Sequence, residues 1–160
     1  MARQNFAAEV LDGARKKAQS LRPDSFTILV TKAAESPVTP GSLLRGRSST
    51  IDGVVEVALQ DDEDVLAQLP GGRASQYAYL SSMAVAPELR RMGGASALLA
   101  AAEQQAGLWG QQWLALHVYA NNRSAVQLYN AAGMQIIGQD PAWRSWIGGK
   151  VRILMAKRIV

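Results

Sequence analysis

The sequence predicts a mixed α/β fold in which a mostly antiparallel sheet is flanked by helices. Short runs rich in β-branched residues recur along the 160-residue chain, separated by segments that contain Pro and Gly. Between the later runs lie two stretches of helical periodicity, which are long enough to serve as crossover connections. The length is close to the common domain size, so we expect residues 1–160 to form a single domain.

The first half of the chain predicts one helix followed by strands. Apolar side chains recur every three or four positions over residues 4–21, which indicates an amphipathic helix that Pro23 ends. Residues 25–33 and 50–60 are rich in β-branched side chains and indicate two strands. For the acidic run at 61–64 we favour a solvated turn over the alternative, a contact with the amine of a substrate.

The second half alternates strands with helices. The expected elements are a strand at 77–86, a helix at 94–106, a strand at 113–119, a helix at 124–132, and closing strands at 134–138 and 150–159. Asn122 is a suitable N-cap for the second of these helices, and Gly133 is a suitable residue to end it. Trp143 and Trp146 lie in the loop before the final strand, where we favour packing over a role in covering a substrate.

Composition excludes several kinds of site. Apolar residues make up 48% of the chain and charged residues 19%, and no apolar stretch is long enough to span a bilayer. The net charge of +4 suits an anionic partner, but the basic residues are scattered, so we expect neither a nucleic-acid nor a membrane partner. With no cysteine and a single histidine, the chain cannot form a disulfide, a cysteinyl intermediate or a multi-histidine metal site, and we expect no metal.

The most informative segment leads from the strand at 77–86 into the next helix. It carries Arg90 and Arg91, followed by Gly93 and Gly94 at the start of the helix. Unpaired N–H groups and the positive end of the dipole make a helix N-terminus suitable for phosphate, and glycine allows a close approach. The segment matches neither a Walker loop nor a dinucleotide fingerprint. It predicts a diphosphate cradle, and the alternative is a plain glycine turn that begins a helix.

Two motifs resemble signatures of the GCN5-related N-acetyltransferase (GNAT) superfamily. Arg90-x-x-Gly93-x-Ala95 is similar to its pyrophosphate-binding motif. Asn122-x-x-Ala125-x-x-Leu128-Tyr129-x-x-x-Gly133-Met134 is similar to its second motif, with Met134 in place of the usual aromatic residue. The resemblance implies the GNAT fold, splayed at the strands 77–86 and 113–119, with the family's N-terminal strand and helix abbreviated.

The resemblance also implies acetyl-CoA as the cofactor and indicates which residues hold it. The end of the strand at 77–86 would contact the pantetheine and the acetyl carbonyl, the helix start would hold the pyrophosphate, and the second motif would line the cofactor arm. The residues so assigned are Met83, Ala84, Val85, Arg90, Arg91, Met92, Gly93, Gly94, Ala95, Ser96, Asn122, Ser124, Ala125 and Tyr129.

Acetyl transfer to an amine requires two groups that handle protons. The amine must lose a proton before it reacts, and the departing thiolate is helped by gaining one. Tyr129 stands where the family supplies this acid, and the alternative is a core aromatic residue. His117 stands where N-terminal acetyltransferases of the superfamily place a base, and strand alternation puts it off the aliphatic face. The alternative for His117 is a hydrogen-bonded structural histidine, and we weigh the two equally.

We assign acceptor contacts to Tyr79, Ser81 and Trp146. The resemblance is closest to protein N-terminal and plastid-type enzymes, and it implies direct transfer to a protein N-terminal α-amine, a lysine ε-amine or both. One alternative is a small arylalkylamine acceptor of the serotonin type, and another is a non-catalytic acyl-CoA-binding module. We expect an intracellular soluble monomer or homodimer. It would lie in the plastid stroma if it comes from an alga or plant with its transit peptide removed, and otherwise in the cytoplasm.

Overall fold

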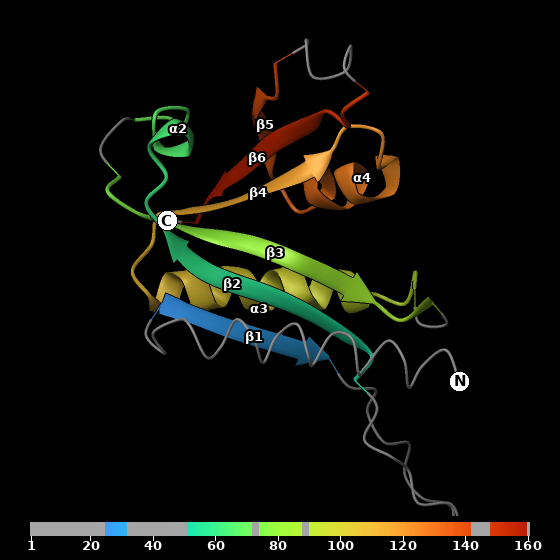
Figure 1. The fold of residues 1–160 in the computed structure, drawn as a ribbon. Coiled ribbons are helices and arrows are strands. Elements are labelled where there is room, and N and C mark those ends of the chain that lie inside the picture. The colour runs from blue at the N-terminus through green and yellow to red at the C-terminus, as the bar shows by residue number, and fades with distance from the viewer. Residues whose placement is uncertain (1–24, 32–50, 72–73, 88–89, 142–147, 160) are drawn as a thin grey trace, which may run out of the picture.

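The computed structural model describes residues 25–31, 51–71, 74–87, 90–141 and 148–159 (Figure 1). The helix expected over 4–21, Trp143 and Trp146 lie outside the described residues. The described elements are β1 (Phe26–Thr31), β2 (Gly53–Gln60), α2 (Glu63–Leu66), β3 (Tyr77–Val85), α3 (Gly94–Leu108), β4 (Trp113–Tyr119), α4 (Arg123–Ala131), β5 (Gln135–Gln139) and β6 (Arg152–Arg158). Within these ranges, no helix is long and apolar enough to cross a membrane.

The acidic run at 61–64 differs from the expected turn. Its second half enters the helical turn α2, because the carboxylate of Asp62 accepts a hydrogen bond from the Val65 N–H at 3.1 Å and so caps the first turn. The four acidic side chains are exposed, whereas Val65 is buried. The run is therefore solvated on one side and anchored to the protein on the other.

The described strands form a mixed sheet with the order β1-β2-β3-β4-β6-β5. Neighbouring strands are antiparallel except for β3 and β4, which confirms the expected mixed, mostly antiparallel architecture. β3 and β4 pair only at Ala78 with Leu114 and at Tyr79 with Ala115. Beyond these two pairs the strands diverge, as the V-shaped arrangement in Figure 1 shows.

Side chains from the two faces of the sheet enter two separate cores. On the first face, α3 and α4 pack on an aliphatic cluster that includes Val57, Leu80 and Leu116. On the second face, Val65 and Leu69 from the segment around α2 pack over a smaller cluster of β3, β4 and β6 residues. Both faces of the sheet are therefore covered where β3 and β4 still pair.

β3 contains a bulge where it passes β2. Ser81 lies opposite Glu56 and Ala84 opposite Val54, so two residues of β3 oppose one residue of β2. Ser82 takes a left-handed φ of 52° at this point. Bulges bend the strand that carries them, and this one lies just beyond the last pair of β3 with β4.

Candidate active site

The N-terminus of α3 offers unpaired backbone N–H groups. Gly93 precedes the helix with a left-handed φ of 85°, and no side chain caps the helix. The Ala97 N–H donates to the Gly93 carbonyl at 3.0 Å, so the N–H groups of Gly94, Ala95 and Ser96 have no partner within the helix. The first turn contains no acidic residue to neutralise the positive end of the dipole. This geometry suits a phosphate group.

The turn that precedes α3 is positively charged and exposed. Arg90, Arg91 and Met92 form it, and Met92 is 72% exposed. The Arg90 Nε donates to the Val85 carbonyl at 3.3 Å, which holds this side chain against the end of β3. A Cβ at Gly94 would lie 3.6 Å from the Val85 side chain, so the start of α3 also packs against the strand end.

Met83, Ala84 and Val85 form the last part of β3, beyond its pairing with β4. Ala84 and Val85 pair with β2 on one side, and no strand in the described part of the chain pairs with them on the other. All three residues are partly buried. Backbone polar groups on the side toward β4 are therefore available to a bound ligand.

α4 places Tyr129 beside the end of β3. The Asn122 side-chain oxygen accepts a hydrogen bond from the Ala125 N–H at 3.3 Å and caps the helix, as expected. Ser124 is exposed and Ala125 is half-buried. Tyr129 is 7% exposed, and its hydroxyl lies 4.0 Å from the Met83 Sδ. Burial raises the pKa of Tyr129, so the phenol carries its proton at neutral pH.

Tyr79 and His117 form a hydrogen-bonded pair on the second face of the sheet. The Tyr79 hydroxyl lies 3.1 Å from the His117 Nδ1, and the two side chains come from neighbouring strands. Burial lowers the pKa of His117, the Arg152 charge lowers it further, and the carboxylates of Asp140 and Asp62 oppose these effects. Burial also raises the pKa of Tyr79. Both side chains are therefore neutral at neutral pH.

A neutral Tyr79–His117 pair can accept one proton in either tautomer of the imidazole. When Nδ1 carries the proton and donates to Tyr79, the lone pair of Nε2 is free to accept another. When the Tyr79 hydroxyl donates to Nδ1, its oxygen can accept a proton as its own proton passes to the histidine. The arrangement is suited to a general base at the divergence of β3 and β4.

Comparison with known proteins identifies the family. A family model described as the Acetyltransferase (GNAT) family matches residues 14–134. The chain belongs to this family. The curated relatives that it matches include Arabidopsis thaliana "GCN5-related N-acetyltransferase 10, chloroplastic", which is 38% identical over 154 residues, 96% of this chain. They also include "GCN5-related N-acetyltransferase 6, chloroplastic" from the same plant, which is 24% identical over 84% of this chain. The chain spans 57% and 50% of the lengths of these two relatives.

Solved structures share the GNAT fold. Arabidopsis thaliana NAA60 in complex with a bisubstrate analogue gives a TM-score of 0.69 at 16% identity, over 97% of this chain and 95% of that one. Chaetomium thermophilum Naa20 in complex with a bisubstrate analogue gives a TM-score of 0.56 at 23% identity, over 72% and 63% of the two chains. These neighbours confirm the expected fold.

The cofactor of GNAT proteins is acetyl-CoA, and the residues at the start of α3 fit its diphosphate. Three N–H groups without a partner in the helix lie at its start, and two arginines precede them. A Cβ added at Gly93 would meet no atom within 4 Å, so the space beside this residue is open to a ligand. The unpaired edge at Met83, Ala84 and Val85 fits the amides of a pantetheine chain.

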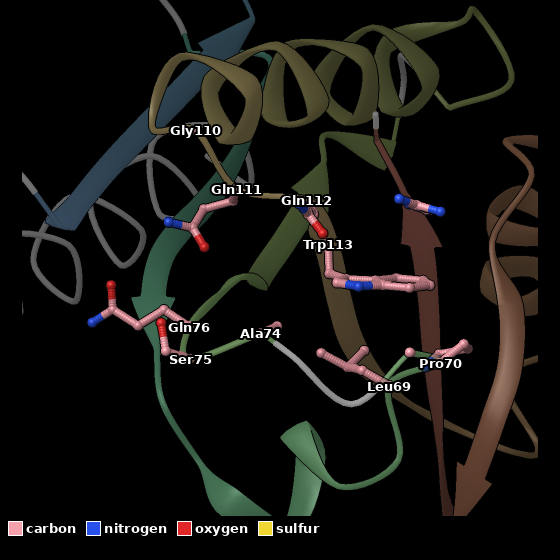
Figure 2. Close-up of a pocket in the computed structure, with 11 residues that line it drawn as sticks. Leu69, Pro70, Ala74, Ser75, Gln76, Gly110, Gln111, Gln112 and Trp113 are labelled. Carbon is pink, nitrogen blue, oxygen red and sulfur yellow. The ribbon is translucent and has the colours of Figure 1, made fainter.

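Of two cavities on the described surface, the second contains predicted site residues and the first does not. The first, about 510 Å³, lies among Gln76, Gln111, Gln112 and Trp113 at the ends of the loops before β3 and β4 (Figure 2). Among the described residues, no histidine or carboxylate lines it. The second, about 630 Å³, is lined by Tyr79 and His117. The second cavity is therefore the candidate acceptor side of this GNAT protein.

Ser81 does not share the contacts of Tyr79, and two residues that the sequence did not suggest line the second cavity. Ser81 follows Tyr79 on the same face, but its hydroxyl donates to the buried Glu56 at 3.1 Å. Sequence reasoning missed the pair of Arg152 and Asp140, in which Nε lies 3.0 Å from Oδ2 and Nη2 lies 3.2 Å from Oδ1. The pair lines the second cavity beside His117, and no local motif in the sequence signals it.

Proposed function

We propose that this GNAT protein transfers the acetyl group of acetyl-CoA directly to a primary amine, either a protein N-terminal α-amine or a lysine ε-amine. One observation carries the proposal. Tyr129 belongs to the core on the first face of the sheet, whereas the Tyr79–His117 pair lies on the second face. The tyrosine and the pair are both located where β3 and β4 diverge. A proton donor and a proton acceptor thus flank the divergence from opposite sides.

The proposed chemistry assigns one task to each group. Bound acetyl-CoA supplies the thioester that donates the acetyl group. The start of α3 and the two arginines hold its diphosphate, and the free edge of β3 orients its arm. His117, directly or through Tyr79, accepts the proton that the ammonium group of the acceptor must lose. Tyr129 supplies the proton that the departing thiolate gains, and it is protonated again by the second proton that the acceptor nitrogen loses as the amide forms.

Peptide acceptors are supported by structural neighbours crystallised with bisubstrate analogues. Arabidopsis thaliana Naa50, with a TM-score of 0.53 and 19% identity over 68% of this chain and 66% of its own, was solved with the analogue CoA-Ac-MVNAL. The curated relatives named above are called chloroplastic, which supports a plastid location. A fluorescent fusion imaged against chlorophyll tests that location.

An acceptor screen tests the function. Peptide α-amines, peptides with only an internal lysine free, and aromatic monoamines are compared at fixed acetyl-CoA, with products assigned by mass spectrometry. We expect amine-dependent release of CoA with peptides. Turnover with aromatic monoamines alone would indicate a small-molecule enzyme, and binding of acetyl-CoA without turnover of any amine would indicate a non-catalytic module.

A further inference from the structure

Tyr77 is a buried polar residue that neither the motifs nor the proposed chemistry uses. It is 1% exposed and lines the 630 Å³ cavity together with Tyr79, against which its ring packs edge-on at a centroid distance of 6.3 Å. Its hydroxyl has no hydrogen-bond partner in the part of the chain that the structure describes. No fully buried polar side-chain atom of the described residues lacks a partner, so the Tyr77 hydroxyl is accessible from the cavity, where a bound group can form a hydrogen bond with it.

The wall of the cavity beside Tyr77 is acidic. Asp64 of α2 and Asp62, the residue that caps α2, line it, and the Asp64 carboxylate has no hydrogen bond or ion pair among the described residues. Across the cavity, the positive charge of Arg152 is paired with Asp140. The cavity therefore carries net negative charge, although the whole chain carries a net charge of +4.

α2 holds this acidic wall firmly against the sheet. Val65 and Leu69 are buried in the core of the second face, and the Gln68 amide lies against Gly138 of β5. Asp62 is itself fixed, because one of its oxygens caps α2. The two carboxylates therefore belong to a segment that Val65 and Leu69 anchor to the sheet.

We propose that the cavity receives the acceptor, and that Tyr77, Asp62 and Asp64 select acceptor chains with a basic residue one or two positions from the acetylated amine. The inference rests on the proposed function and names its substrate class. The reacting amine reaches the Tyr79–His117 pair, while the neighbouring Lys or Arg side chain lies against α2. Its charge meets the two carboxylates, and the Tyr77 oxygen accepts a hydrogen bond from it.

The test uses peptides that are identical except for Lys, Gln or Glu at the second position. For the unmodified protein we expect kcat/KM to fall in that order, with about a tenfold difference between Lys and Glu. The double variant Asp62→Asn/Asp64→Asn should lose most of this preference, and asparagine still caps α2. Glu63→Gln is the matched control, because Glu63 is exposed on the same helix but does not line the cavity.

Tyr77→Phe provides a second, independent variant. It should raise KM for the Lys peptide several-fold while the dissociation constant of acetyl-CoA stays unchanged. An unaltered Lys-over-Glu preference in the double variant, with both proteins folded by circular dichroism, would overturn the inference and leave the acetyltransferase proposal intact. If no peptide is acetylated by a protein that binds acetyl-CoA, both proposals fail.

Discussion

Replacing Tyr129 with phenylalanine removes one oxygen from the centre of the proposed reaction. The ring is 7% exposed and packs in the core of the first face, so phenylalanine keeps nearly all of its contacts. The hydroxyl lies 4.0 Å from the Met83 thioether, a weak acceptor. The free energy of unfolding should therefore fall by less than about 1 kcal/mol.

The expected loss in turnover is much larger than the loss in stability. A positioned general acid contributes about 10²- to 10⁴-fold to a rate, and each tenfold step is about 1.36 kcal/mol of barrier. Burial raises the pKa of Tyr129 above its ordinary value of 10.0, so the unmodified protein keeps this acid protonated throughout neutral and mildly alkaline pH. The Tyr129→Phe variant should accordingly lose about 2.7 to 5.4 kcal/mol of transition-state stabilisation across that range.

Release of CoA can be followed with a thiol-reactive chromophore, because the chain has no cysteine to give a background signal. Isothermal titration should give a dissociation constant for acetyl-CoA within about twofold of the unmodified value, since the diphosphate site is untouched. A kcat within twofold of that of the unmodified protein would refute the acid role. A kcat that falls together with acetyl-CoA binding would indicate a structural defect instead.

Three further changes address the base and the diphosphate site. His117→Ala should abolish the acid limb of the pH–rate profile. This limb lies below pH 6.5 because burial lowers the pKa of His117. If the limb persists in the variant, the base is another group or water. Asp140→Asn removes a negative charge that raises the pKa of His117, so the acid limb of kcat/KM should move to lower pH. A shift to higher pH would contradict the assignment of this limb to His117. A Cβ at position 93 has open space around it, but Gly93 has a left-handed φ that alanine disfavours. Chemical denaturation of Gly93→Ala should therefore show a free energy of unfolding lower by about 1–2 kcal/mol. Titration of the same variant should show weaker binding of acetyl-CoA. If both the free energy of unfolding and the affinity for acetyl-CoA are unchanged, the backbone at Gly93 does not form the diphosphate site.

The helix and strands around the proposed acetyl-CoA site could be predicted from the sequence because each is a contiguous segment. The helix α3 begins at Gly94, as expected, since Gly93 takes a conformation that favours glycine. The strand β4 has the expected bounds, because Leu114, Leu116 and Val118 alternate with the other residues and enter the aliphatic core. Local patterns of this kind directly report which residues share a face or a turn.

The surroundings of the proposed acceptor cavity could be predicted only in part, because distant segments of the chain build them. Strand alternation placed His117 off the aliphatic face, but its contact with Tyr79 depends on parallel pairing of β3 with β4. Arg152 reaches the same cavity because β6 inserts between β4 and β5. The acidic run at 61–64 gave no sign that Val65 would anchor it over the sheet. Pairing order and long-range packing are not encoded in any local window.

The bulge in β3 explains how one strand serves both faces. Strict alternation would put Tyr77, Tyr79, Ser81, Met83 and Val85 on a single face. The extra residue at Ser82 reverses the phase, so Tyr77 and Tyr79 enter the core of the second face, whereas Met83 and Val85 pack against that of the first. Met83 can therefore contact Tyr129 while Tyr79 contacts His117, only four positions earlier on the same strand. The proposed separation of proton donor and proton acceptor thus depends on the bulge in β3. No hydrophobic pattern in this segment of the sequence reveals that bulge.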